Sequence, residues 1–151
     1  MNWDELAEGI DCPFDVPCVE PNPYWESVCT LRVSTLCLLK NQTYRGHCIL
    51  IFNPRHVLRL DQLNPSEWIE YAEDLRHSVR AVMAECKPDH INMESIGNQI
   101  PHLHWQVIPR YKDDPRWGGP VWTTTLEEYS HRELPDDEQA ALATGIRARL
   151  K

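Results

Sequence analysis

Short runs of apolar and β-branched residues follow one another between Val28 and Phe52. The runs VCTLRV and STLCLL come close together, and a third, HCILIF, follows the polar stretch KNQTYRG. Runs of this length separated by polar turn residues are typical of β-strands. The pattern predicts an antiparallel meander that ends at Asn53-Pro54.

A helical pattern follows the meander. Asn64 is a favourable N-cap, Pro65 suits the first turn, and Glu67 can reach back to the cap. Apolar residues then recur at helical spacing until Pro88, which stops the helix. These residues are Ile69, Ala72, Leu75, Val79, Val82, Met83 and Cys86. The spacing predicts a helix of about 20 residues with one apolar face that packs on the sheet.

Two further strands and a second helix are expected in the C-terminal half. The strands are predicted over Ile91–Ile96 and His102–Pro109, on either side of a turn at Gly97-Asn98. Asp113–Tyr129 is loop-like, and a final helix is predicted over Pro135–Leu150.

The N-terminal stretch has a different composition. It contains four prolines before Glu26 and little periodicity, so we expect it to wrap the surface and to contribute no core element. The order of elements predicts an α+β fold with an antiparallel sheet. One domain is expected over residues 1–151, with a core at 28–111, an N-terminal wrap at 1–27, and a C-terminal loop and helix at 112–151.

The charge balance limits the classes of ligand. The 151 residues include 15 Lys and Arg against 23 Asp and Glu, a net charge of −8. Such a surface repels a phosphate backbone, so a nucleic acid polymer is not an expected partner, but a pocket can still bind one small phosphorylated molecule. No apolar run approaches the ~20 residues that cross a membrane. The acidic start MNWDELAEG lacks a secretory signal, which predicts a cytoplasmic protein.

Six cysteines in such a chain are expected to be reduced. Cys29, Cys37 and Cys48 lie in strand-like stretches and are expected to be small buried hydrophobic residues. Cys12 and Cys18 are separated by five residues, wider than the usual metal knuckle, and no second pair follows. The spacing therefore predicts no structural zinc.

The candidate chemistry lies in the predicted strand His102–Pro109. Side chains alternate along a strand, so His102, His104 and Gln106 share one face, while the apolar residues between them face the core. A one-residue slip would bury two imidazoles and expose Trp105, which fixes the register.

A row of imidazoles has several possible roles. It can bind a metal, exchange protons or attack an electrophile, and it can also be a hydrogen-bonded pair without a function. A metal needs further ligands, and Val107–Tyr111 offers no carboxylate. A nucleophilic role fits better, because His104 is central on the polar face and N–H groups of the Gly97-Asn98 turn can hold phosphate oxygens.

Two blocks of the sequence resemble the histidine triad (HIT) superfamily. Gly97-Asn98 followed by Pro101–Arg110, PHLHWQVIPR, is similar to the motif His-Φ-His-Φ-His-Φ-Φ, where Φ is apolar, which often ends in Pro-Arg. Gly46–Ile51, GHCILI, with Pro54–Val57, PRHV, resembles the segment Gly-His-x-Leu-Val-x-Pro-Lys/Arg-x-His. The resemblance runs from roughly Thr35 to Arg110, and the tail from Asp113 to Trp122 looks like that of small bacterial HIT proteins.

This resemblance implies a function and a chemistry. Members hydrolyse or transfer nucleoside monophosphates through a covalent nucleotidyl-histidine, with no metal at the catalytic site. It implies a HIT-like fold, a small nucleotide substrate, no cofactor and a homodimer. The wide Cys12 to Cys18 spacing differs from the Cys-x-x-Cys of zinc-bearing relatives.

The resemblance also assigns roles to residues. His104 falls on the nucleophile, His102 on its supporting histidine, and His47 on a more distant histidine beside the phosphate. The substrate-binding positions that it implies are Asn92, Gly97, Asn98, Gln99 and Arg110, with Lys40 or Asn41 near the base and ribose. Of the other histidines, we expect His56 to bond backbone groups, and His77, His90 and His131 to be solvated.

Gln106 departs from the motif, which has histidine at this position. An amide donates and accepts hydrogen bonds but cannot act as an acid or base. Glutamine here resembles the uridylyltransferase and dinucleoside polyphosphate phosphorylase branches, which transfer the nucleotidyl group to a phosphate acceptor. The alternatives are therefore hydrolysis, transfer, or a nucleotide-binding regulatory module with little turnover.

Overall fold

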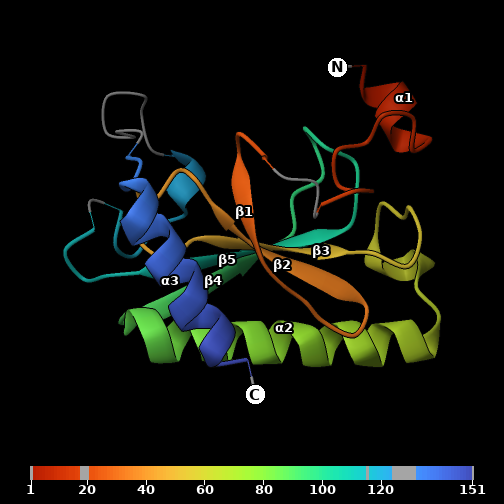
Figure 1. Ribbon diagram of the computed structural model, residues 1–151. Coiled ribbons are helices and arrows are strands. Elements are labelled where there is room, and N and C mark those ends of the chain that lie inside the picture. The colour runs from red at the N-terminus through yellow and green to blue at the C-terminus, as the bar shows by residue number, and fades with distance from the viewer. Residues whose placement is uncertain (1, 18–20, 115, 124–131, 151) are drawn as a thin grey trace.

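Five strands and three helices form the chain in the computed structural model, which describes residues 2–17, 21–114, 116–123 and 132–150 (Figure 1). The strands are β1 Trp25–Thr30, β2 Ser34–Leu39, β3 Cys48–Phe52, β4 His90–Glu94 and β5 His104–Arg110. The helices are α1 Trp3–Ala7, α2 Pro65–Cys86 and α3 Asp136–Ala148, with 3₁₀ turns η1 Leu60–Gln62 and η2 Val121–Thr123. The sheet order is β1-β2-β3-β5-β4, and all neighbours are antiparallel. The expected α+β fold is confirmed.

One face of the sheet is covered by α2 and α3 (Figure 1). Alternate residues of each strand point to this face, because side chains in a strand change sides at every residue. Leu36, Leu50 and Phe52 pack there against Val82 of α2 and Ile146 of α3. This layer is the main hydrophobic core, and it fixes which side chains of β5 point away from the helices.

The opposite face is covered by the N-terminal segment, and this corrects the expectation of a surface wrap. Leu6, Cys12 and Phe14 are buried in a second cluster with Ile49 and Ile51 of β3. Strand β1 also begins at Trp25, earlier than expected, and Trp25 belongs to the same cluster. Helices α2 and α3 cover only one face, so the N-terminal segment, which includes α1, removes the other face from water.

Helix α2 has the expected ends but a different buried stripe. Asn64 accepts hydrogen bonds from the N–H groups of Ser66 and Glu67, and the Glu67 carboxylate accepts from the Asn64 N–H. Ile69 and Met83, expected on the apolar face, are exposed, at 63% and 39%. The buried positions include Tyr71, Asp74 and Ser78. Each of these polar side chains has a buried partner: Asp74 accepts from the β1–β2 turn, and the hydroxyls of Tyr71 and Ser78 donate to carbonyl oxygens of Leu50 and Asp74.

Asp74 joins α2 to that turn, and its loss is expected to destabilise the fold. Its carboxylate accepts hydrogen bonds from the Val33 N–H at 3.0 Å and the Ser34 hydroxyl at 2.7 Å. Asp74→Ala leaves these buried donors without an acceptor, so the free energy of unfolding should fall by about 2–4 kcal/mol. Urea unfolding measures the change. The control Glu73→Ala removes an exposed carboxylate and should leave the free energy of unfolding nearly unchanged. Equal effects of the two variants would contradict this role of Asp74.

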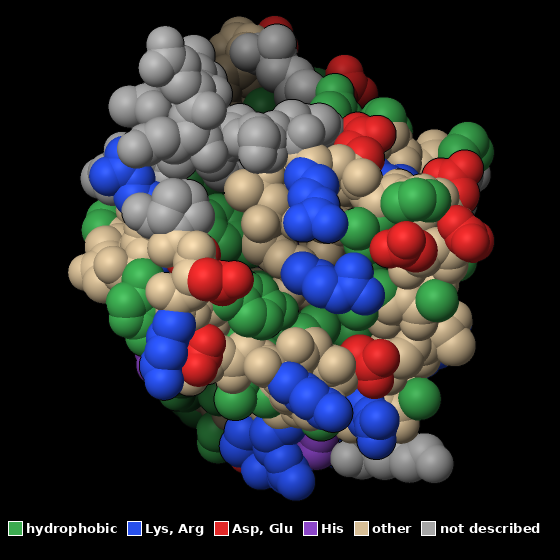
Figure 2. Space-filling model, turned by 90° about the vertical axis from the view of Figure 1, so that its left-hand side faces the viewer, with side chains coloured by type: hydrophobic (Ala, Val, Ile, Leu, Met, Phe, Trp, Pro, Cys, Tyr) green, Lys and Arg blue, Asp and Glu red, His purple; other side chains and the backbone are tan. Residues whose placement is uncertain are grey.

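Two surface properties bear on the expected partners. No helix in the described part of the chain is both long and apolar enough to span a membrane. On the face in Figure 2, Lys and Arg side chains lie among Asp and Glu side chains and hydrophobic ones. The absence of a nucleic acid partner and the cytoplasmic location stay predictions.

Candidate active site

Strand β5 presents its polar face on the side of the sheet away from α2. Trp105 and Val107 pack into the core under α2, so His104 and Gln106 point to the other side. His102 immediately precedes the strand, and both His102 and His104 are buried. The alternation predicted from the sequence is therefore confirmed, although the strand begins at His104.

His104 is held in one tautomer. Its Nδ1 lies 2.7 Å from the carbonyl oxygen of His102. A carbonyl oxygen only accepts hydrogen bonds, so Nδ1 carries the proton and Nε2 keeps a lone pair. Burial lowers the pKa of His104, which favours this neutral form. An imidazole in this form can accept a proton or attack an electrophile through Nε2.

Gln106 is oriented by His47, which lies behind it. His47 Nε2 is 2.8 Å from Gln106 Oε1 and donates to it, because the amide oxygen only accepts. The Oε1 atom of Gln106 is therefore occupied by His47, which leaves the amide NH₂ of Gln106 to donate to another group, such as a bound ligand. Gly46, which precedes His47, has a left-handed backbone conformation with φ +89°, which favours glycine. A side chain at this position would also collide with Cys86.

His47 is expected to make stability depend on pH. Burial lowers the pKa of His47 from 6.5 to about 4, and the hydrogen bond that His47 donates to Gln106 opposes this shift. The unfolded chain binds the proton more readily, so the stabilisation is complete above pH 6.5 and is lost as the pH falls toward 4. The free energy of unfolding should fall through this window by on the order of 3 kcal/mol more than in His47→Gln.

Denaturant unfolding of both proteins between pH 7 and pH 4 tests this. His77→Gln, which changes a partly exposed histidine on α2, is the control and should follow the wild type. A constant stability difference between wild type and His47→Gln across the window would show that His47 is not a buried neutral imidazole.

A cavity of about 440 Å³ opens in front of His104. Its lining combines apolar side chains with one imidazole and several amides. It is lined by Phe14, Ile96, Asn98, Gln99, Ile100, His104, Gln106 and Trp122. The Phe14 ring meets the His104 ring edge-on at 5.0 Å. Trp122 donates from Nε1 to the Glu94 carboxylate, which fixes this wall.

The loop before β5 supplies polar groups to this cavity. Asn98 and Gln99 line it, as expected, whereas Gly97 lines a hollow on the other side of the loop and accepts a hydrogen bond from Trp3 Nε1. In the described part of the chain, the N–H groups of Asn98 and Gln99 donate to no protein acceptor. Free N–H groups of this kind can bind an oxyanion.

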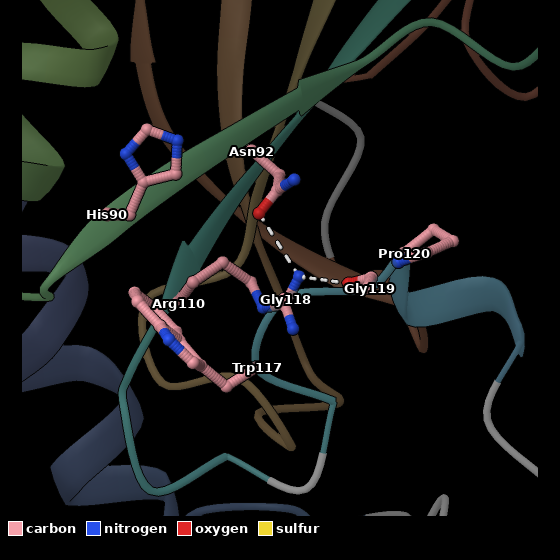
Figure 3. A pocket seen from close by; sticks show the side chains of 7 residues that line it. All are labelled: His90, Asn92, Arg110, Trp117, Gly118, Gly119 and Pro120. Carbon is pink, nitrogen blue, oxygen red and sulfur yellow. Dashed lines mark hydrogen bonds between the residues drawn. The ribbon is translucent and has the colours of Figure 1, made fainter.

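Arg110 and Asn92 lie elsewhere, in a separate hollow on the far part of β5 and β4 (Figure 3). The Arg110 guanidinium donates to both carboxylate oxygens of Asp114, to Asn92 Oδ1, and to the carbonyl oxygens of Arg116 and Gly119. All of its N–H groups are used, so the structure argues against the expected substrate contact of Arg110. Its role is to hold the loop that follows β5.

Lys40 and Asn41, the other expected binding positions, do not line the cavity either. The Asn41 side chain accepts hydrogen bonds from the N–H and hydroxyl of Thr43, which closes its own turn. Sequence reasoning instead missed Phe14, Ile96, Ile100 and Trp122 as cavity walls. They come from segments without a motif, and only the tertiary fold brings them to His104.

A group of metal-ligating side chains lies behind His102. One donor atom from each of Cys12, Asp15, His56 and His102 lies within 4.8 Å of the other three. His56, expected to bond backbone groups, instead places Nδ1 3.1 Å from the Asp15 carboxylate, which corrects that expectation. The predicted absence of zinc rested on the spacing from Cys12 to Cys18, and Cys18 is outside the described residues. The relevant partners of Cys12 are distant in the sequence.

Comparison with known proteins gives a consistent picture. The HIT domain family model matches residues 27–113. Bis(5'-adenosyl)-triphosphatase of Saccharomyces cerevisiae is 33% identical over 72 residues, which cover 44% of this chain and 35% of that protein. The chain thus matches about a third of the length of this curated relative.

Two solved structures share the fold. A histidine triad (HIT) protein from Sinorhizobium meliloti 1021 has a TM-score of 0.74 at 22% identity, covering 83% of this chain and 89% of that one. A histidine triad protein from Bradyrhizobium japonicum has a TM-score of 0.75 at 20% identity, covering 84% and 91%.

Proposed function

The chain belongs to the HIT domain family, and from this we propose that it cleaves a phosphoanhydride or phosphoramidate of a nucleoside monophosphate derivative through a covalent nucleotidyl-histidine. A dinucleoside polyphosphate is one substrate of this class. The observation that carries the proposal is His104, whose Nδ1 is tied to the His102 carbonyl while the ring lines a cavity. The yeast relative, a bis(5'-adenosyl)-triphosphatase, acts on a substrate of this chemistry.

In the first step, His104 Nε2 attacks the α-phosphorus. A P–N bond forms, the bond from phosphorus to the leaving oxygen or nitrogen breaks, and the leaving group takes the electron pair. The Gln106 NH₂ and the free N–H groups of Asn98 and Gln99 are suited to hold the non-bridging oxygens. In the second step, water or a phosphate attacks the same phosphorus, and the P–N bond breaks to restore the imidazole.

The cavity favours a nucleoside on the phosphate. Phe14 and Trp122 supply aromatic surface and Ile96 an aliphatic one, within about 440 Å³. Flat bases pack well between such side chains, and a pocket of this size suits a small organic ligand. The walls contain few fixed donors, so we expect tolerance among bases.

Gln106 makes the nature of the second step a separate question. His47 is neutral and its Nε2–H is committed to Gln106, so neither residue is placed to exchange a proton with the leaving group at neutral pH. Among the described residues that line the cavity, no carboxylate or second imidazole can accept the proton of an attacking water, whereas a phosphate ion arrives deprotonated. We therefore expect nucleotidyl transfer to phosphate to be faster than hydrolysis.

The homodimer that the resemblance implies stays a prediction.

A second candidate function is a nucleotide-binding regulatory module, which Gln106 also permits because amides bind phosphate without catalysis. A thermal-shift screen against mononucleotides and dinucleoside polyphosphates, followed by product analysis for each ligand that binds, separates the two. We expect at least one binder to be cleaved at its α-phosphorus. Binding without any product, in water and in phosphate, would favour the regulatory module.

A further inference from the structure

A second cavity, of about 600 Å³, adjoins the one in front of His104. Asn98 lines both cavities, whereas Gly97 and Pro101 of the same loop line only the second. The loop before β5 is therefore a partition between two spaces that meet at Asn98. A ligand that extends beyond the first cavity at this point enters the second.

Trp3 forms a wall of the second cavity. Its Nε1 donates to the Gly97 carbonyl oxygen at 3.4 Å, which ties α1 to the partition loop, and 47% of the residue remains exposed. Its one polar side-chain atom is already bonded, so the exposed surface is that of an aromatic ring, on which a flat heterocycle stacks well. Trp3 lies outside residues 27–113, the part matched by the family model, so this wall comes from the chain's own N-terminal segment.

Arg59 gives the second cavity a guanidinium, a group that the first cavity lacks. None of the described residues that line the first cavity is a lysine or an arginine. Arg59 donates from Nε and Nη2 to the carboxylate of Asp61, which also lines the second cavity, at 2.9 and 3.0 Å, and Nη1 makes no hydrogen bond to a described residue. The N–H groups of Nη1 can therefore donate to a phosphate oxygen while the ion pair stays intact.

The proposed substrates include molecules with a second end that the first cavity does not hold. A dinucleoside polyphosphate carries a nucleoside at each end of its phosphate chain, whereas the space of about 440 Å³ in front of His104 suits one small organic group. Attack at the α-phosphorus makes the far nucleoside, with its remaining phosphates, the leaving group. A phosphate chain that crosses Asn98 brings this group to Arg59 and Trp3.

We infer that the second cavity binds the leaving half of a dinucleoside polyphosphate. The Trp3 ring stacks on the far base, and Arg59 Nη1 and the Asn98 amide hold the phosphates between the two nucleosides. Leu58 and Leu60 add apolar surface to this cavity. This subsite rests on the proposed function, since a leaving group exists only if His104 attacks phosphorus. Trp3 and Arg59 are then the residues that favour substrates with two nucleosides over substrates with one.

Rates on two substrates with different leaving groups test the subsite. Trp3→Ala and Arg59→Ala should each lower kcat/KM for a dinucleoside triphosphate by about tenfold, because the stacking or the phosphate contact is lost. Both variants should stay within about twofold of wild type on the matching nucleoside 5′-phosphoramidate, because its leaving group is ammonia, which does not reach the second cavity. The matched controls Trp68→Ala and Arg76→Ala remove an exposed tryptophan and an exposed arginine of α2, and they should leave both rates unchanged.

A second measurement does not depend on turnover. In the His104→Ala background, which should bind the substrate without cleaving it, a dinucleoside triphosphate should bind about tenfold more tightly than the mononucleotide. Adding Trp3→Ala should remove this difference, whereas Trp3→Phe keeps an aromatic ring and should retain most of it. Calorimetry measures both affinities.

Each outcome decides between the subsite and its absence. Equal losses on the two substrates would show that Trp3 and Arg59 only support the fold, and unchanged rates on both would show that they contact no substrate; either result overturns the subsite. Cleavage of the phosphoramidate with no preference for the dinucleoside ligand in either measurement would overturn the subsite and keep the proposed function. Tighter dinucleoside binding that depends on Trp3, without cleavage of any substrate, would support a nucleoside site in the second cavity and reject the proposed function.

Discussion

His104→Ala is expected to lower turnover by at least about 10³-fold on the best nucleotide substrate, because the variant has no atom that can form the bond to phosphorus. The loss should appear in kcat and leave KM little changed. The cavity walls Phe14 and Trp122, and the donors of the 98–99 loop, remain in the variant. Mononucleotide binding, measured by calorimetry, should therefore change by only a few-fold.

A histidine outside the site provides the control. His77→Ala removes a partly exposed imidazole beside Glu73 on α2, which covers the face of the sheet opposite to His104, and should keep the wild-type rate. If His104→Ala retained most of the wild-type activity, His104 would have to be abandoned as the nucleophile, whatever the resemblance of the motif.

Restoring the triad with Gln106→His should accelerate hydrolysis by about 10²- to 10⁴-fold, the usual range for general acid–base catalysis. An imidazole at this position can give a proton to the leaving group and accept one from water, which the amide cannot. Gln106 lines the cavity, so an imidazole at this position would face the same space as His104. The advantage of added phosphate over water should shrink in the variant.

The measurement compares nucleotide release in water and in phosphate buffer for both proteins. Gln99→His is the matched control, because it adds an imidazole to the same cavity from the loop and should not produce the gain. A wild type that hydrolyses as fast as Gln106→His and ignores phosphate would show that Gln106 is a neutral replacement.

Local patterns predicted the elements and the orientation of β5 well. Alternation between Leu103 and Val107 placed His104 and Gln106 on one face, because a strand has only two faces and the apolar one must be buried. The ends of α2 were also predictable from local residues, because Asn64 caps the first turn and Pro88 cannot continue the helix. The resemblance to HIT proteins then singled out β5 as the strand of the proposed nucleophile.

The remaining features depend on contacts that local patterns do not contain. Cys12 and His102 are separated by 90 residues and meet only because the N-terminal segment crosses the sheet. Arg110 follows the motif, but its hydrogen bonds to Asp114 are decided by the loop after the strand. Asp74 is buried because it meets the N–H groups of another turn, although its residue type favours exposure.

The same limit applies to the cavity. Phe14 and Trp122 are far apart in the sequence and belong to no repeat or motif, yet both line the space in front of His104. Their positions follow from the packing of the second sheet face and from the hydrogen bond of Trp122 to Glu94. The sequence therefore predicted the candidate reacting group, His104, but not the apolar residues that line the cavity in front of it.

The most direct test is the mass of the protein after reaction. Wild type mixed with a cleaved dinucleoside polyphosphate in the absence of phosphate, and quenched without acid to protect the P–N bond, should gain the mass of one nucleotidyl group. Peptide mapping should locate it on His104, and His104→Ala should gain none. A substrate that is turned over with no adduct at any time, or an adduct on a residue other than His104, would contradict the covalent mechanism.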